Sequence, residues 1–191
     1  MVVVIGSPTL TGEPLPAGRR AAGLGAAIAL AAARAGAHVE LVGKVGDDAG
    51  GDLIAVELER AGVGHAALLR DPSAATPGAS GDRALRLARQ DVELALRYLV
   101  DFRVIVAADP LPDAVAEAVA DAARYAGAHR VLIDGPDGAD EGVTVLQAPR
   151  HGAGAFAAFV GRYAALLDAG HDPKRAFTSA VSDVGWEPAH G

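Results

Sequence analysis

The residue types that this 191-residue chain lacks already narrow its functions. It contains no cysteine, which excludes disulfides, thiolate metal sites and cysteine nucleophiles. It also contains no asparagine, and aromatic residues make up only 4% of it. The formal net charge of −7 argues against nonspecific nucleic-acid binding, because such binding requires a basic face. We therefore expect no nucleic-acid partner.

Long apolar runs are missing as well. Charged residues bracket the most apolar region, so no stretch reaches the length that spans a membrane. The first apolar run begins at Val2, without a basic leader or a cleavage site before it. We therefore expect no membrane partner and no signal peptide, and we predict that the protein is cytoplasmic.

Apolar residues are nevertheless plentiful, at 51% of the chain. Many of them are alanines, which bury little area per residue and permit close helix packing. This content is sufficient for a hydrophobic core without covalent cross-links. The length predicts a single domain over residues 1–191.

Apolar runs and helical patterns alternate along the chain. Strands are expected over residues 2–5, 38–42, 65–69, 104–108, 130–133 and 143–146. Helices are expected over residues 19–34, 52–62 (with Asp52 as the cap), 90–100, 112–125, 154–167 and 173–184 (with Asp172 as the cap). Loops are expected over 7–18 and 71–82, and residues 83–87 fit either an edge strand or a helix start.

This alternation predicts a three-layer α/β/α fold with a mostly parallel sheet. In such a fold, ligands bind at the carboxyl ends of the strands. These ends are expected near Gly6, Gly43, Asp109, Asp134 and Gly152.

A glycine turn precedes the long apolar helix near the C-terminus. Residues 151–156 have the sequence His-Gly-Ala-Gly-Ala-Phe and join the last expected strand to this helix. The first N–H groups of a helix have no intrahelical partner, so a glycine turn at a helix start can bind an anion. We therefore predict an anion-binding turn at Gly152, Ala153 and Gly154.

Metal-binding patterns are weak. The six histidines form no HExxH arrangement or close pair, which makes a zinc site improbable. Acidic residues follow one expected strand, but their spacing does not match a calcium loop: Asp134, Asp137, Asp140 and Glu141. We predict no metal site.

The glycine cluster at Gly23 and Gly25 has a superficial likeness to a dinucleotide fingerprint. In that motif the glycines follow the first strand at once, and an acidic residue ends the second strand. Here Gly23 lies far beyond Gly6, and the second strand leads into Gly43 and Lys44. A Rossmann-like nucleotide-binding protein therefore stands only as an alternative.

Two segments together resemble the ribokinase or PfkB-type carbohydrate kinase family. Residues 22–36 and 41–51 look like its N-terminal signature, a glycine-rich helix start followed by LVGKVGDDAGG. Residues 152–156 look like its C-terminal GAGDaF motif. The resemblance implies a ribokinase-like fold. The lid and part of the nucleotide half would be reduced, because the loops over 7–18, 71–82 and 134–143 are short.

The resemblance also implies where a substrate would bind. The matching positions are Gly23, Gly25, Ala27, Gly43 and Asp48. At two positions that bind sugar hydroxyls in the family, one of them Ala27, the chain departs from the pattern. Ser7 follows the first strand in place of an aspartate, and Ala27 stands in place of an asparagine.

The implied catalytic machinery is incomplete. The aspartate that serves as the base in the family falls on Ala155, or on Gly154 if the alignment is shifted by one residue. Without asparagine, the family's N-x-x-E element for metal-bound phosphates cannot exist. Phosphoryl transfer depends on positioning and charge stabilisation, so these losses leave no credible route to turnover. We assign no catalytic residue.

We therefore expect a PfkB-like homologue that is inactive in phosphoryl transfer. It would bind a small sugar or phosphate ligand, or serve as an oligomeric structural partner, and it would need no cofactor. The alternative is an active ATP-dependent sugar or nucleoside kinase with magnesium, with Asp48, Asp134 or Asp137 as the acid-base group. Trimmed lids expose sheet edges, which favours a homo-oligomer.

Overall fold

The computed structural model describes residues 1–12, 18–78, 85–136 and 141–185. A seven-stranded sheet with the order β5-β4-β1-β7-β8-β9 runs through it, and β6 also pairs with β4. Its strands are β1 (Val2–Ile5), β4 (Val39–Gly46), β5 (Val63–Gly64), β6 (Leu68–Asp71), β7 (Val104–Ala107), β8 (His129–Ile133) and β9 (Val143–Leu146). Every pairing within this sheet is parallel.

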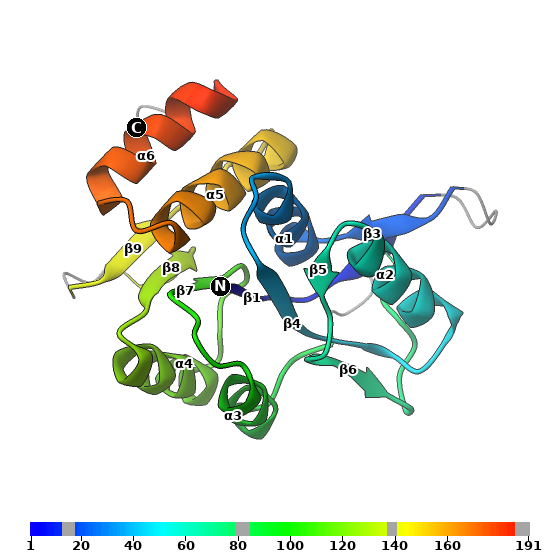
Figure 1. Cartoon of the computed structure of the whole chain (residues 1–191). Helices are drawn as coiled ribbons and strands as arrows, with labels where there is room; N and C mark the ends of the chain where they lie inside the picture. The colour runs from blue at the N-terminus through cyan, green and yellow to red at the C-terminus, as the bar shows by residue number, and fades with distance from the viewer. Residues whose placement is uncertain (13–17, 79–84, 137–140, 186–191) are drawn as a thin grey trace.

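Helices cover both faces of the sheet (Figure 1). One face packs against α1 (Leu24–Arg34), α2 (Ala49–Arg60) and α5 (Ala153–Asp168), and α6 (Pro173–Val184) packs against α5 on the same side. The other face packs against α3 (Arg89–Tyr98) and α4 (Asp113–Ala126). The three-layer, mostly parallel fold predicted from the sequence is therefore confirmed.

The central strands read as continuous apolar runs because both of their faces are buried. Val2 and Val4 of β1 contribute to the core beneath α1 and α5, whereas Val3 and Ile5 contribute to the core beneath α3 and α4. All four side chains are fully buried. Alternation of side chains across a strand thus divides one sequence run between two cores.

A short antiparallel hairpin precedes α1 and corrects two sequence predictions. Thr9–Thr11 (β2) pairs with Arg20–Ala22 (β3), so the expected loop over 7–18 contains a strand and the expected helix over 19–34 begins only at Leu24. Tertiary contacts hold the hairpin: the backbone amide of Leu10 donates to the carbonyl of Pro77 at 2.9 Å, and its side chain is buried. The backbone amide of Ala21 donates to the carboxylate of Glu57 on α2.

The boundaries of other elements also differ from expectation. The cap of α2 is Asp48 rather than Asp52, because the Asp48 carboxylate accepts the backbone N–H of Gly51 at 2.9 Å. The single strand expected over 65–69 is replaced by β5 and β6, which both pair with β4. Of the ambiguous segment 83–87, residues 85–87 belong to neither a helix nor a strand, and the rest lies outside the described residues.

No helix in the described parts of the chain is long and apolar enough to cross a membrane.

Candidate functional site

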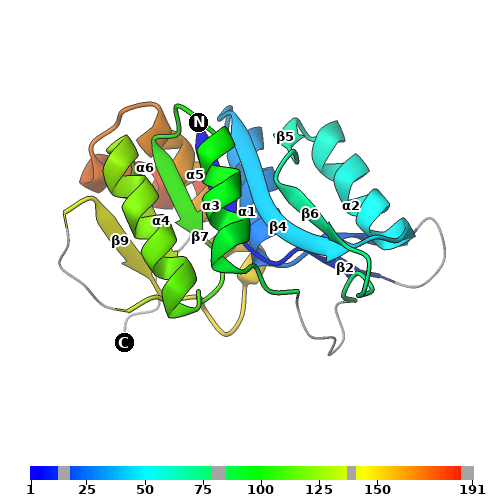
Figure 2. The ribbon, with the colours of Figure 1, turned by 90° about the horizontal axis from the view of Figure 1, so that it is seen from below.

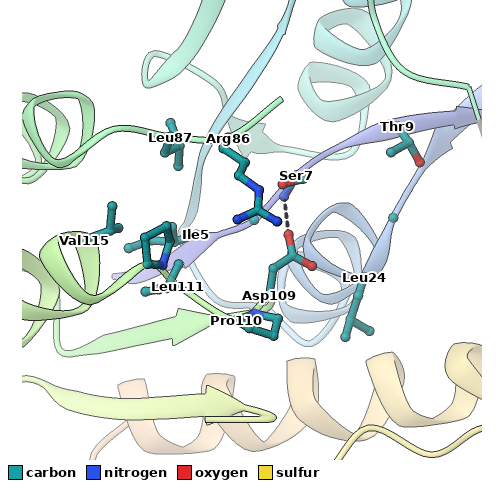
Figure 3. Close-up of a pocket in the computed structure, with 13 residues that line it drawn as sticks. Ile5, Ser7, Thr9, Leu24, Arg86, Leu87, Asp109, Pro110, Leu111 and Val115 are labelled. Atoms are coloured by element: carbon teal, nitrogen blue, oxygen red, sulfur yellow. Dashed lines mark hydrogen bonds between the residues drawn. The ribbon is translucent and has the colours of Figure 1, made fainter. Parts of the chain in front are cut away.

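The order of the strands in the sheet reverses at β1, and a cleft opens there. The next strand of this sheet along the chain, β4, pairs with one edge of β1, and the later strand β7 pairs with its other edge. In open α/β sheets such a switch point, at the carboxyl ends of the strands, is where ligands bind. A cleft of about 370 Å³ lies at the ends of β1 and β7, and we call it the β1–β7 cleft (Figure 3).

Glycines shape one side of this cleft. Gly23 precedes α1 with a φ of 88°, and a Cβ there would lie 2.7 Å from the carbonyl oxygen of Ser7. A Cβ on Gly25 would lie 3.0 Å from the Cα of Gly6, so α1 starts directly against the end of β1. Glycine suits the positive φ at Gly23 because it has no Cβ, and it allows the close approach of Gly25 to Gly6 for the same reason. The glycine cluster in the sequence therefore brings the start of α1 to the cleft.

Asp109, two residues after the end of β7, reaches across to the end of β1. Its Oδ2 accepts the backbone N–H of Ser7 at 2.7 Å. Among the described residues, its second oxygen, Oδ1, has no hydrogen-bond partner. Because one oxygen fixes the carboxylate, the other remains available as an acceptor inside the cleft.

Three further polar side chains line the same cleft. They belong to Ser7, Thr9 and Arg86. In Figure 3 the Arg86 guanidinium points toward the Asp109 carboxylate. The remaining walls are largely apolar: Ile5, Leu24, Leu87, Pro110, Leu111, Pro112 and Val115. A few convergent polar groups in an apolar cleft are the usual composition of a small-molecule site.

The expected anion-binding turn lies at the start of α5. Gly152, with a φ of 81°, precedes the helix without a side-chain cap, and the backbone at Gly152, Ala153 and Gly154 is exposed. This turn is not part of the lining of the β1–β7 cleft. Ala155 is exposed too and carries no ionisable group.

Sequence comparison places this chain in a family. The model for the pfkB family carbohydrate kinase matches residues 17–162, which is more than half of the chain. The protein belongs to the pfkB family of carbohydrate kinases. Among curated proteins, none matches the sequence.

Solved structures of PfkB-type kinases share the fold. Ribokinase from Arabidopsis thaliana, solved with ribose and ATP, has a TM-score of 0.65 and 17% identity over 96% of this chain and 90% of its own. Aminoimidazole riboside kinase from Salmonella enterica has a TM-score of 0.67 and 16% identity over 96% and 90%. A sugar kinase from Pyrococcus horikoshii, solved with ATP, has a TM-score of 0.53 and 16% identity, and only 53% of its chain is covered. At these identities the likeness shows the fold alone.

The fold places the predicted substrate residues of this PfkB member in different surroundings. Gly23 lines the β1–β7 cleft, and Gly25 lies beneath it against Gly6. Ala27 is half-buried in α1 and packs against the core. Gly43 lies inside β4, where a Cβ would come within 2.8 Å of the carbonyl oxygen of Gly6. Only Gly23 of the five predicted residues, therefore, lines this cleft.

Asp48, the fifth predicted residue, is engaged in a hydrogen-bond network. Its carboxylate accepts the backbone N–H of Thr76 at 2.8 Å and the Thr76 hydroxyl at 2.6 Å, in addition to the N–H of Gly51. Burial acts to raise the pKa of this carboxyl, but the bonds from Thr76, Gly51 and Gly50 outweigh it and lower the pKa below its ordinary value of 3.8. The network joins the start of α2 to the loop after β6.

The acidic loop after β8 provides no cation site in the described structure. Asp134 uses its Oδ1 to accept the backbone N–H of Ala148 at 2.9 Å, which holds the segment that leads to α5. Asp137 and Asp140 lie outside the described residues. Within the described ranges, no group of three histidine or acidic residues could hold a metal ion.

Sequence reasoning found only part of the cleft. The strand-end rule pointed to Asp109, because the carboxyl ends of parallel strands meet at one edge of the sheet. Nothing in the sequence pointed to Thr9 or Arg86, which enter the cleft from the hairpin and from the segment before α3. Their positions depend on tertiary packing of loops that carry no motif.

Proposed function

We propose that this PfkB member binds a small sugar that carries an anionic group, such as a sugar phosphate, in the β1–β7 cleft, and that it does not transfer a phosphoryl group. One observation carries the proposal: a carboxylate held by a backbone N–H, a guanidinium that points toward it and two hydroxyl-bearing residues line one cleft at the switch point of the sheet. The family match supports a carbohydrate as the ligand class.

The polar groups suit the two halves of such a ligand. The free Oδ1 of Asp109 is an acceptor for a sugar hydroxyl, and the hydroxyls of Ser7 and Thr9 are further partners. Arg86 supplies a planar cation that binds phosphate or carboxylate through paired N–H donors. The start of α1, which lacks a side-chain cap, adds the positive end of a helix to the cleft wall.

The second half of the proposal rests on the chemistry at the start of α5. Residues 152–155 are Gly-Ala-Gly-Ala and offer backbone groups without a carboxylate. The nearby acidic side chain of Asp134 already accepts a backbone N–H, and Asp48 accepts three donors. These engaged carboxylates, and the missing carboxylate at residue 155, support a site that binds a ligand without transferring a phosphoryl group.

A ligand screen tests the binding. Thermal unfolding of the purified chain would be followed with neutral sugars, sugar acids, sugar phosphates and nucleotides. We expect sugar phosphates to raise the unfolding temperature by about 5–10 °C at a hundredfold excess over Kd. If no compound raises it, the chain does not bind this ligand class and the proposal fails.

Two variants assign the binding to the cleft. Calorimetric titration with the best ligand should show that Arg86→Ala and Asp109→Asn each weaken binding about tenfold or more. Matched controls are Arg34→Ala at the far end of α1 and Glu59→Gln on α2, both exposed and outside the cleft. Equal loss in cleft and control variants would place the ligand elsewhere.

A turnover assay separates binding from catalysis. ADP formation from ATP would be measured with each ligand that binds and with magnesium present. We expect no ligand-dependent ADP formation. Turnover that disappears in Asp109→Asn would instead establish an active kinase in which the cleft carboxylate takes part.

A further inference from the structure

An apolar surface on the opposite layer of the molecule has no role in the β1–β7 cleft. Among the described residues, five large hydrophobic side chains are exposed, and four of them lie on or beside α3 and α4: Leu94, Tyr98, Val100 and Tyr125. We call these four residues, together with Leu99, the α3–α4 face. Tyr98 is 76% exposed and Tyr125 is 97% exposed, which is unusual for aromatic side chains in a chain that has so few.

The face combines projecting side chains with hollows. A hollow of about 840 Å³ lies between α3 and α4, and Leu99, Val100 and Tyr125 are among the residues that line it. A second hollow, of about 380 Å³, lies between α3 and β6 and is lined in part by Leu94 and Tyr98. Leu99 lines both hollows, so the two hollows lie on either side of the C-terminal end of α3. Figure 2 shows α3 and α4 side by side as the layer nearest the viewer.

The rim of the larger hollow carries both signs of charge. Arg97 and Asp101 line it, and neither side chain has an ion-pair or hydrogen-bond partner among the described residues. Asp121, in contrast, pairs with Arg124 on the same helix at 2.8 Å. Glu93, the remaining acidic residue of the lining, pairs with Arg89 at 2.7 Å, so among the described residues the rim offers one unpaired cation and one unpaired anion.

We propose that the α3–α4 face is a two-fold interface between two copies of this chain. In such an interface the same patch lies on both subunits, so each feature of the patch must find its complement within the patch itself. The face meets this condition twice. The projecting tyrosines face hollows of suitable apolar lining, and Arg97 of one copy faces Asp101 of the other.

A second copy also fits the charge better than other occupants. The chain carries a net charge of −7, so two copies repel each other unless they meet where the charges balance. The mixed rim provides such a place. A basic or an acidic partner would leave either Arg97 or Asp101 buried beside a like charge.

Sedimentation velocity over a range of protein concentrations tests the association. We expect a concentration-dependent dimer of the full chain. Tyr98→Glu and Tyr125→Glu should each raise the dissociation constant about thirtyfold or more, because aromatic anchors dominate such interfaces. The matched control is Val56→Glu, which changes the fifth exposed hydrophobic residue, on α2, and should leave the dissociation constant unchanged.

A charge exchange tests the geometry of the pair. Arg97→Asp alone and Asp101→Arg alone should each weaken the dimer, whereas an equal mixture of these two variants should form a heterodimer. In the mixture both symmetry-related contacts regain opposite charges. Circular dichroism and thermal unfolding of each variant would confirm that it is folded.

Three results would overturn the proposal. One is a monomer at every concentration up to the millimolar range, which would leave the face to a different partner. Another is a dimer that both tyrosine variants leave intact. The third is a dimer that is broken by Val145→Glu but not by the tyrosine variants. Val145 lies on β9 at the edge of the sheet, so this result would place the interface there.

Discussion

The Oδ2 atom of Asp109 accepts the backbone N–H of Ser7 at 2.7 Å, and this single bond joins the ends of β7 and β1. It fixes the carboxylate while its other oxygen faces the β1–β7 cleft. We predict that Asp109→Asn keeps the bond, because an amide oxygen can also accept it, and changes the free energy of unfolding by less than about 1 kcal/mol. Urea unfolding measures this change. A much larger loss of stability would mean that the charge of Asp109 supports the fold itself.

The contact between α5 and α1 gives a second prediction. A Cβ on Gly161 would lie 2.6 Å from the Cβ of Ala31 and 2.7 Å from the backbone nitrogen of Ala32. Gly161→Ala should therefore lower the free energy of unfolding by about 1–3 kcal/mol, because one of the two helices must shift.

Gly154→Ala is the matched control on the same helix. A Cβ there meets no atom within 4 Å. This variant should raise the free energy of unfolding by about 0.5–1 kcal/mol, because alanine favours a helix over glycine. Denaturant unfolding of the two variants checks both signs. Equal effects would show that helix propensity, and not the contact with α1, decides the outcome.

Thr76 gives a third prediction, because its hydroxyl has two partners. It donates to Asp48 at 2.6 Å and accepts the buried backbone N–H of Gly46 at 3.0 Å. Thr76→Val leaves that N–H without an acceptor and should lower the free energy of unfolding by about 1–3 kcal/mol. Thr178→Val is the control: its exposed hydroxyl donates only to the carbonyl of Lys174. We expect a change within about 0.5 kcal/mol there.

The same network predicts a dependence on acid. The pKa of Asp48 is lower in the folded protein than its ordinary value of 3.8. Its contribution to stability is therefore complete above the unfolded pKa and is lost as the pH falls through the folded pKa. Unfolding measured from pH 6 down to about pH 2.5 should show a shallower acid loss in Asp48→Asn than in the unaltered chain. Parallel curves for the two proteins would contradict this role.

His129 predicts a second, milder pH dependence. Its Nε2 lies 2.8 Å from the Thr144 hydroxyl, which lies 2.9 Å from the hydroxyl of the buried Tyr163. Burial, with a smaller contribution from the neighbouring Arg130, lowers the pKa of His129 below its ordinary value of 6.5. Stability is then complete above the unfolded pKa, and part of it is lost as the pH falls toward the folded pKa.

His129→Gln should remove this loss between pH 7 and about pH 5, while the amide can still contact Thr144. His151→Gln, at an exposed position, is the control and should leave the curve unchanged. Thermal unfolding in matched buffers gives both curves. An unchanged loss in His129→Gln would assign the effect to other groups.

The start of α5 gives a last prediction. Ala155→Asp introduces a carboxylate where PfkB kinases carry their base, as the sequence resemblance implies. We expect no ATP-dependent transfer in this variant, because a base alone does not supply the binding of magnesium and nucleotide phosphates. A coupled ADP assay with sugars measures it. Ligand-dependent turnover in Ala155→Asp would show that the nucleotide site is intact and that only the base is missing.

The sequence alone determined the fold class and most of its elements. The apolar run at β1, the glycine after α1 and the cap at Asp172 act locally, so their patterns can be recognised without any partner. The sequence also identified the family, because the family's motifs contain glycines at positions where no Cβ fits. Gly23, close to the carbonyl oxygen of Ser7, is one of them.

Only the tertiary structure decided which residues meet. The hairpin β2–β3 could not be recognised locally, since its buried Leu10 is held by Pro77, which lies far along the chain. Asp109 and Ser7 are likewise distant in sequence and meet only because β1 and β7 pair. Local pattern fixes where the backbone turns and which face is apolar. The contents of a cleft depend on long-range packing, and no short segment of this sequence carries that information.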